Sequence, residues 1–406
     1  MLYSSITELP EKHRKEVLKS MPVPPVRTIT LGVADPHPLS SATIQQAAVI
    51  LRQASTRFSE AGYEVQTVRL STRPIFDDLA DCSSAAMIDY VKELQRMLDD
   101  AGLAFCSLGT AKATLPDFPL ERLELIADLL IPTSALNATV QIANVGSGLR
   151  TEAALPTARI MQRLAQETAE GFGNFRFAML ARVEPGCPFF PTAYHSGPGS
   201  LSIGLQGAGI ITEALCAEQS PLELALRVKD ALVKYATPIV ALGQGLAKEQ
   251  QLIFGGIDLS PAPLGEDSII TAIEHAGFGR FGSPGTLAVV AALTAALKST
   301  GLPTCGYCGL MLPVLEDAVL GQRWEDGAVN VHQLLLYSAI CGTGLDTIPL
   351  PGDYPVESIA HLLLDVATLA LRLQKPLSAR LFPVPGKQAG ERTMFTSPYL
   401  TNTLVR

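Results

Sequence analysis

Acidic and hydroxyl side chains cluster after the apolar run 252–258, which predicts a buried strand. Two prolines end that strand, because proline has no N–H to donate to a sheet. Asp258, Ser260 and Asp267 therefore follow a strand, where ligands bind in α/β proteins. We predict that Asp258 is an acid, a base or a cation ligand, that Asp267 is a cation ligand, and that Ser260 binds substrate. The alternative is that Asp267 or Ser268 only caps the next helix.

Two further carboxylates follow apolar runs, Glu316 after 310–315 and Asp346 after the glycine-rich stretch 341–345. Carboxylates that converge on one pocket repel one another unless a hard cation or a shared proton neutralises them. We therefore predict that Glu316 is a catalytic acid or base and that Asp346 joins Asp258 and Asp267 in binding Mg²⁺ or Ca²⁺. The alternative is that each carboxylate is a separate cap or turn residue.

Histidine and cysteine offer other routes to catalysis. His195 lies on a loop rich in glycine and proline and titrates near neutral pH, so we predict proton transfer by His195. Cys341 precedes a glycine-rich turn and is a candidate nucleophile, although a buried packing role is the alternative. Cys305 and Cys308 have thioredoxin-like spacing, but neither the fold context of a redox motif nor the second pair of a zinc site accompanies them.

Glycine pairs stand at several predicted strand ends. Backbone N–H groups at such turns can hold an anion, so Gly146 and Gly344 are candidates for binding a small anionic substrate. Arg27, Asn144 and Ser147 complete the set of predicted substrate-binding residues. The alternative is that these glycines serve sharp corners of the fold. No stretch matches a phosphate-binding loop or a dinucleotide fingerprint, so the sequence does not support nucleotide use.

Composition limits the function classes. The 406 residues are 47% hydrophobic and 17% charged, with a net charge of −8, which argues against nucleic-acid binding. The apolar runs 286–297 and 362–373 are too short for a membrane span. We find no secretory signal, and seven cysteines at irregular spacing fit free thiols, so we expect a cytoplasmic protein. The low charge and positive mean hydropathy favour a homo-oligomer.

Extended and helical patterns alternate along the chain, which predicts an α/β fold. Two successive predicted strands without a helix between them, 175–183 and 200–206, indicate a mixed or antiparallel sheet region. We expect one domain over residues 1–406 with an N-terminal helix at about 1–22. The predicted strands are 27–33, 64–70, 103–108, 135–142, 175–183, 200–206, 252–258 and 378–383, and the predicted helices are 42–61, 85–101, 120–130, 152–170, 221–246 and 268–276.

Eight motifs in order resemble one known family. They are 27–33, 144–147, 188–189 with 193–196, 257–260, 265–268, 313–317, 340–346 and 384–387. Together the chain resembles the domain of unknown function 711 family, also described as pyruvate formate-lyase-like. The resemblance implies a ten-stranded α/β barrel related to the glycyl radical enzymes, and it implies no particular activity. Where many relatives have a glycine pair, this chain has 395–399 without glycine, so we expect no glycyl radical.

These observations predict a non-radical enzyme with lyase or isomerase chemistry on a small carboxylate or carbonyl substrate at the barrel mouth. A divalent cation is a possible cofactor. The alternative is a catalytically inert metabolite-binding or regulatory barrel, which would need only shape and charge at His195.

Overall fold

The fold is built on one ten-stranded sheet that contains every strand in the described residues. A computed structural model describes residues 24–215, 220–265 and 267–406. The predicted N-terminal helix at about 1–22 lies outside them. The strands are β1 (Val26–Gly32), β2 (Val68–Ser71), β3 (Cys106–Ala111), β4 (Leu136–Asn144), β5 (Gly148–Leu149), β6 (Phe177–Ala181), β7 (Ser200–Leu205), β8 (Ile253–Asp258), β9 (Gly344–Pro351) and β10 (Leu377–Val384).

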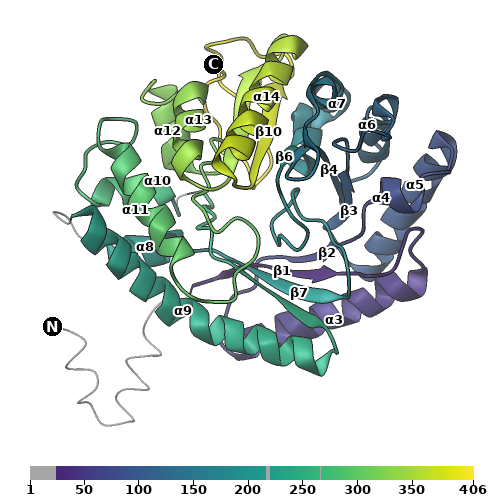
Figure 1. Ribbon diagram of the computed structural model, residues 1–406, viewed down its shortest axis with the longest axis horizontal. Helices are drawn as coiled ribbons and strands as arrows, with labels where there is room; N and C mark the ends of the chain where they lie inside the picture. Colours follow the sequence, from purple (N-terminus) through teal and green to yellow (C-terminus); the bar gives the residue numbers. More distant parts are fainter. Residues whose placement is uncertain (1–23, 216–219, 266) are drawn as a thin grey trace.

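Helices surround the outer side of this sheet (Figure 1). They are α3 (Ser41–Glu60), α4 (Ile75–Asp78), α5 (Ser84–Ala101), α6 (Leu125–Leu130), α7 (Ala154–Glu167), α8 (Ala208–Ala214), α9 (Pro221–Glu249), α10 (Ile269–His275), α11 (Thr286–Lys298), α12 (Ala318–Glu325), α13 (Val331–Ile340) and α14 (Val356–Leu373). The predicted α/β class is therefore confirmed.

The strand order is β8-β7-β1-β2-β3-β4-β6-β10-β9, with β5 beside β4. Pairs β1–β2, β2–β3, β3–β4 and β4–β6 are parallel, whereas β7 and β10 run antiparallel to β1 and β6. The sheet is therefore mixed, as the two successive strands β6 and β7 predicted.

The sheet is not closed by a strand pair, so the predicted barrel is not confirmed. Its edge strands β8 and β9 are separated by the segment 303–317, which has no regular strand. Isolated bridges join this segment to both edges, Thr304 to Ile257 and Pro313 to Asp346. The curved sheet thus has an inner face, which the segment 303–317 helps to enclose.

Side chains alternate between the two faces of a strand, and β6 follows this rule. Phe177 and Met179 belong to the main core between sheet and helices. Ala178 and Leu180 belong to a second buried cluster, together with Tyr307 of the segment 303–317. The inner face is therefore filled by side chains and by irregular segments, and this is where a site can form.

Helix signals in the sequence match the structure well. In α5, the Ser83 side chain accepts from the N–H of Ala86, and Gly102 ends the helix with a φ of 70°. The helix buries an apolar stripe that includes Leu94 and Leu98. Truncating a side chain such as Leu94 to alanine typically costs about 2–5 kcal/mol.

The strands β5 and β9 and the helices α4, α8 and α11 to α14 are absent from the predicted strand and helix ranges. Strand β9 contains Pro349 and Pro351, which usually argue against a strand. Among the described strands, β9 is an edge strand whose one ladder is with β10, and its other side has the single bridge at Asp346. The N–H groups that Pro349 and Pro351 lack are therefore not needed for a second ladder. The strand predicted at 64–70 begins later in the structure, since β2 starts at Val68.

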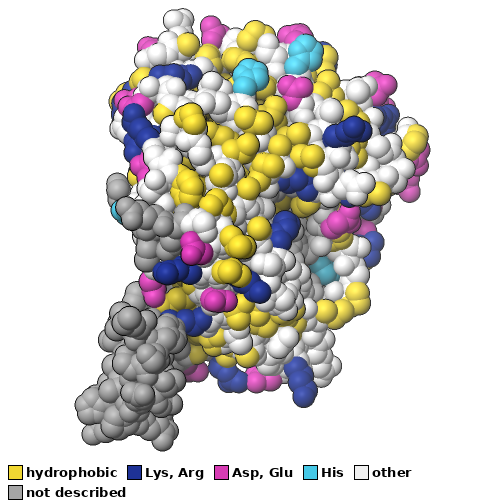
Figure 2. Space-filling view, turned by 60° about the vertical axis from the view of Figure 1, so that its left-hand side comes forward, with side chains coloured by type: hydrophobic (Ala, Val, Ile, Leu, Met, Phe, Trp, Pro, Cys, Tyr) yellow, Lys and Arg dark blue, Asp and Glu magenta, His cyan; other side chains and the backbone are white. Residues whose placement is uncertain are grey.

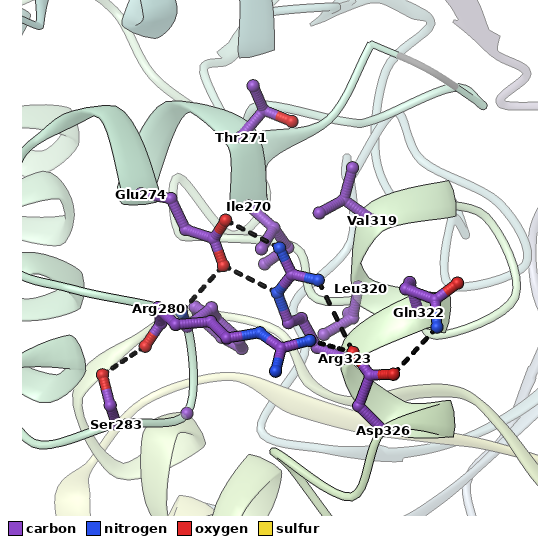
Figure 3. A network of polar contacts seen from close by, with 12 residues as sticks. Ile270, Thr271, Glu274, Arg280, Ser283, Val319, Leu320, Gln322, Arg323 and Asp326 are labelled. Atoms are coloured by element: carbon purple, nitrogen blue, oxygen red, sulfur yellow. Dashed lines mark hydrogen bonds and ion pairs between the residues drawn. The ribbon is translucent and has the colours of Figure 1, made fainter.

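An ion-pair network on the outer side joins α10 to α12 (Figure 3). The Arg323 guanidinium donates to both oxygens of Glu274 at 2.7 and 2.8 Å and lowers the pKa of that carboxyl. Asp326 pairs with Arg280 and lies 3.7 Å from Arg323. These charges are partly exposed, so the network orients the two helices more than it stabilises the fold.

Asp317 connects the starts of the same two helices. Its carboxylate caps α12 by accepting from the N–H groups of Val319 and Leu320, both at 3.0 Å. The same carboxylate accepts from Ser268 Oγ at 2.6 Å and from the N–H of Ile269 at 3.1 Å, at the start of α10. Asp317 therefore fixes the backbone beside Glu316.

None of the helices in the described ranges has both the length and the apolar character needed to cross a membrane.

Candidate functional site

A cavity of about 70 Å³ lies on the inner face of the sheet. Strands β1, β2, β4 and β6 each contribute their second residue, namely Arg27, Arg69, Asn137 and Ala178. These four strands run in the same direction, so the cavity is near their amino ends. Its position differs from the carboxyl-end location that we predicted from strand ends.

Arg380 enters the cavity from β10 and binds two carboxylates. Its Nε donates to Asp346 Oδ1 at 2.6 Å, and its Nη2 donates to Glu316 Oε1. Although burial acts to lower the pKa of Arg380, Asp346 and Glu316 together raise that pKa above its ordinary value. Arg380 is therefore a fully paired cation.

Arg27 belongs to a chain of side chains that leaves the cavity. Its Nη1 donates to Gln66 Oε1 at 3.1 Å, Gln66 donates to Gln206, and Gln206 donates to Asp267. The Arg27 Nη2 atom is 3.8 Å from Glu316 Oε2, beyond hydrogen-bond distance. Hydrogen bonds thus link Asp267 to the cavity through two amides, its charge also acts on the pKa of Arg27, and it lines a separate pocket beside α8 and α9.

Arg69 is the least compensated charge in the cavity. The residue is 7% exposed, and its Nε donates to Thr67 Oγ1 at 3.0 Å. Within the described residues, neither of its Nη atoms donates a hydrogen bond and no carboxylate is within 4.0 Å. Its guanidinium carbon lies 5.2 Å from the ring centre of Phe105 and 5.3 Å from that of Phe190.

The electrostatics of Arg69 follow from this arrangement. Burial, and then repulsion from Arg27, lowers the pKa of Arg69 to about 9. A buried guanidinium without a paired anion is costly, and aromatic faces repay only part of that cost. The cavity therefore holds a cation that an added anion would stabilise.

The charge balance of the cavity leads to the same conclusion. Three guanidiniums, from Arg27, Arg69 and Arg380, face two carboxylates, from Glu316 and Asp346. With both carboxylates ionised, one positive charge is uncompensated. A monoanionic group such as a carboxylate would balance it.

Glu316 carries a free oxygen in this cation-rich cavity. Arg380 occupies Oε1, whereas Oε2 accepts no hydrogen bond within the described residues. Burial raises the pKa of Glu316 and outweighs the opposing attraction of Arg380 and Arg27. A raised pKa and one free oxygen suit a group that accepts and returns a proton.

Aromatic rings form the rest of the cavity wall. Phe175 stacks on Tyr399 with ring centres 5.8 Å apart, and Phe105 meets Tyr399 edge to face at 6.4 Å. Tyr399 comes from the segment 395–399, where we expected no radical glycine. The segment therefore contributes an aromatic wall to the cavity.

The predicted residues Asp258 and Ser260 form a separate buried cluster. Asp258 is 0% exposed and accepts from the N–H groups of Ser260, Tyr307 and Cys308 at 2.9, 2.7 and 3.0 Å. The Ser260 hydroxyl donates to Asp258 at 2.6 Å and accepts from the N–H of Gly309 at 3.0 Å. Neither residue lines the central cavity. Together they hold the backbone of the loop 305–309 in place, and we call this arrangement the amide clamp.

Four other predicted residues lie toward the carboxyl ends of the parallel strands. Asn144 ends β4, seven residues after Asn137, which corresponds to roughly 23 Å along a strand. It binds Thr114 and the N–H of Ser147, and with Gly146 and Ser147 it lines a shallow surface pocket.

His195 is the fourth of these residues, and it is buried. Its ring packs on Gly32 at the end of β1, and Nε2 is 3.1 Å from the carbonyl oxygen of Gly197. Burial lowers the pKa of His195, which weakens the case for proton transfer near neutral pH. The structure does not bring His195 or the group at 144–147 to the central cavity.

Cys341 and Gly344 serve packing. Cys341 is 1% exposed, burial raises the pKa of its thiol to about 11, and its carbonyl oxygen accepts from Lys375. Gly344 has a φ of 99°, and a Cβ there would collide with the carbonyl oxygen of Ser378. A reactive thiolate and an anion cradle are therefore not supported at these positions.

The predicted cation ligands do not converge. Asp258 is bound by backbone amides, Asp267 by Gln206, and Asp346 by Arg380. Across the described residues, no group of three or more His, Cys, Asp or Glu side chains could hold a metal ion. Carboxylates already paired in this way do not offer the open oxygen set that Mg²⁺ or Ca²⁺ requires.

Three predicted site residues therefore meet in the cavity, Arg27, Glu316 and Asp346. Neither Arg69 nor Arg380 was predicted from the sequence. A usable signal was present, because each is the one charged residue of a mainly apolar strand, in 68–71 and in 377–384. A charge buried in a strand needs a compensating partner or a ligand.

Comparison with known proteins identifies the family. The family model described as "Uncharacterised ACR (DUF711)" matches residues 21–396. A UPF0210 protein of Pyrobaculum aerophilum is 32% identical, over 82% of this chain and 76% of that protein. UPF0210 proteins of Thermoanaerobacter sp. and Methanosarcina mazei are 28% and 25% identical over 91% of this chain, and over 88% and 87% of their own lengths. The chain therefore belongs to the uncharacterised family DUF711.

Proposed function

We propose that the protein is a non-radical enzyme that binds a small carboxylate in the central cavity and moves a proton on it through Glu316. The observation that carries the proposal is the buried guanidinium of Arg69, which has no anionic partner within the described residues. A carboxylate of the substrate would supply that partner. Lyase or isomerase chemistry is the class that we propose.

The proton transfer breaks one bond in the substrate and forms one bond on Glu316. Ionised Glu316 takes a proton from the carbon next to the carboxyl or carbonyl group of the substrate, so a C–H bond breaks and an O–H bond forms. The electron pair of the C–H bond moves toward the substrate oxygen, where the neighbouring guanidiniums stabilise the added negative charge. Return of the proton to another atom gives an isomerase, and loss of a leaving group gives a lyase.

Arginines take the part that we had assigned to a cation. Three guanidiniums already neutralise the carboxylates of the cavity and leave charge for the substrate. The proposal therefore needs no metal. The barrel closure and the likeness to glycyl radical enzymes remain part of the proposal, supported by the curved sheet and the bridges of the segment 303–317 to both sheet edges.

Binding is tested first, with propionate, lactate and pyruvate titrated calorimetrically into the wild type, Arg69→Met and the control Arg96→Met. Arg96 is a surface residue whose side chain is 72% exposed. Loss of a charged hydrogen-bond donor is worth about 1.5–3 kcal/mol, so we expect Arg69→Met to bind at least roughly tenfold more weakly. Equal binding by wild type and Arg69→Met would refute the proposed site.

Chemistry is tested by exchange in D₂O, followed by NMR of the protons next to the carboxyl or carbonyl group. We expect exchange with the wild type and with Glu357→Gln, an exposed control, and none with Glu316→Gln. Glu316→Gln should still bind the acid. Arg69-dependent binding without exchange in the wild type would instead favour the alternative, a catalytically inert metabolite-binding protein.

We also propose a cytoplasmic homo-oligomer. Large apolar side chains are exposed on three helices, with Leu222 and Leu226 on α9, Leu287 on α11, and Leu336 and Ile340 on α13. Figure 2 shows one face on which apolar atoms spread between charged ones. Light scattering of the purified protein measures the number of subunits.

A further inference from the structure

Tyr307 lies on a tight loop that folds around the carboxylate of Asp258. The N–H of Tyr307 donates to Asp258 Oδ2 at 2.7 Å, and the carbonyl oxygen of Tyr307 accepts from Lys298 Nζ at 3.1 Å. Gly306 precedes it with a φ of 64°, and a Cβ there would collide with Asp258. Both backbone polar groups of Tyr307 are thus fixed by distant parts of the chain.

The loop directs the Tyr307 side chain into the central cavity. The residue is 2% exposed and lines that cavity together with Arg69. Tyr307 and Met311 also pack in the small apolar cluster on the inner face of the sheet, so the ring is held on its sides. The position of the hydroxyl is therefore set by a fixed backbone and a packed ring.

The hydroxyl of Tyr307 has no hydrogen-bond partner within the described residues. Thr192 and Ser378 are its nearest polar neighbours, and because their own hydroxyls donate to the carbonyl oxygens of Phe189 and Thr343, neither donates to Tyr307. Buried polar groups are paired in the great majority of cases, so an orphaned one in a cavity indicates a missing partner. Burial also raises the pKa of Tyr307, which keeps its proton in place as a donor.

We propose that Tyr307 is a substrate-binding residue whose hydroxyl donates a hydrogen bond to a second oxygen of the substrate, while Arg69 binds the carboxylate. The substrate class is then a small hydroxy or oxo carboxylic acid. Asp258 is a positioning residue that acts through the Tyr307 loop. This inference rests on the proposed function, because it assumes that the carboxylate occupies the cavity.

The test compares three acids of equal carbon number, propionate, lactate and pyruvate, by calorimetric titration of the wild type and Tyr307→Phe. One neutral hydrogen bond corresponds to roughly fivefold in affinity. We expect the wild type to bind lactate or pyruvate at least roughly fivefold more tightly than propionate. Tyr307→Phe should lose that preference and keep the wild-type affinity for propionate.

Tyr194→Phe is the matched control. Tyr194 is also a buried tyrosine, but its hydroxyl donates to the carbonyl oxygen of Val183 at 2.8 Å and it does not line the cavity. We expect Tyr194→Phe to lower the melting temperature and keep the preference. The Tyr307 hydroxyl makes no hydrogen bond within the described ranges, so Tyr307→Phe should change the preference and leave the melting temperature nearly unchanged.

The outcomes separate this inference from the proposed function. Arg69-dependent binding of all three acids with equal affinity would overturn the role of Tyr307 alone. A preference that survives in Tyr307→Phe would do the same, and it would be the result expected if an ordered water satisfies the hydroxyl. Absence of any Arg69-dependent binding would overturn the proposed function together with this inference.

Discussion

Two buried carboxylate sites, that of Asp258 and that of Glu316 with Asp346, have different kinds of partners. Asp258 is held by backbone N–H groups of residues 260, 307 and 308 and by the Ser260 hydroxyl. Glu316 and Asp346 are held by the Arg380 side chain, with Arg27 and Arg69 in the same cavity. Burial raises the pKa of both Asp258 and Glu316, so a raised pKa alone does not distinguish them.

The partners explain what each group can do. Backbone amides cannot leave Asp258 without unfolding the loop 305–309, so its oxygens are not open to a ligand. Guanidiniums have several donors each, and Arg27 and Arg69 have donors that no group in the described part of the chain accepts. A carboxylate among side-chain cations beside a cavity can therefore take part in chemistry, whereas a carboxylate wrapped in amides holds the fold.

The largest expected effect breaks the amide clamp. Asp258→Asn replaces one of the two acceptor oxygens with an NH₂ group. In place of Oδ2 this group would face the N–H of Tyr307, and in place of Oδ1 it would face the donors from Ser260 and Cys308. An orphaned buried amide and weakened neighbouring bonds should together lower the free energy of unfolding by roughly 3–5 kcal/mol. Urea denaturation measures this loss. The exposed Asp353→Asn should stay within about 0.5 kcal/mol, and a similarly small change for Asp258→Asn would contradict the clamp.

Two arginines of the cavity should respond with opposite signs. Arg380→Met removes the partner of two buried carboxylates, so we expect a loss of about 3 kcal/mol in unfolding free energy. Arg69→Met removes a buried charge that has no anionic partner within the described residues, so stability should rise by about 1 kcal/mol while carboxylate binding weakens. Denaturation without added acid compares both variants with the wild type. A destabilised Arg69→Met would mean that the fold already compensates this charge.

Three of the five charged residues of the central cavity were predicted from the sequence. Arg27, Glu316 and Asp346 stand at the edges of apolar runs, and such positions are where charged residues reach a site. Arg69 and Arg380 lie in the interior of the predicted strands 64–70 and 378–383, where periodicity suggests only burial, whereas Arg27 begins the predicted strand 27–33. Their meeting depends on the curvature of the sheet, which brings β1 and β2 opposite β10, and no local pattern encodes that curvature.

The interpretation of Asp258 was misleading for a related reason. Its position at the end of a strand was correctly predicted, since β8 ends at Asp258. Besides Ser260, its partners come from a loop about fifty residues later, and they are backbone N–H groups that carry no side-chain signal. The same loop explains the spacing of Cys305 and Cys308, whose thiol pKa values burial raises above the ordinary value. That spacing surrounds Gly306 and Tyr307 and does not create a redox pair.

The smallest expected effect is a pH dependence at Glu316. Burial raises its pKa in the folded protein above the ordinary value of 4.5. Between these two pKa values the folded state holds a proton that the unfolded state has lost. Stability contributed by protonated Glu316 is therefore complete below about pH 4.5 and is lost as pH rises through the folded pKa, by at most about 1.4 kcal/mol per pH unit.

Glu316→Gln removes this dependence because glutamine does not titrate. The difference in unfolding free energy, wild type minus variant, should fall as pH rises from below 4.5 and then level off. The affinity for an anionic ligand should also depend on the charge of residue 316. When residue 316 is neutral, the three guanidiniums face one carboxylate, and an anionic ligand binds more tightly. Propionate should thus bind Glu316→Gln more tightly than wild type at neutral pH and equally at low pH. A difference that stays constant with pH would assign Glu316 a permanent charge, like that of a structural ion pair.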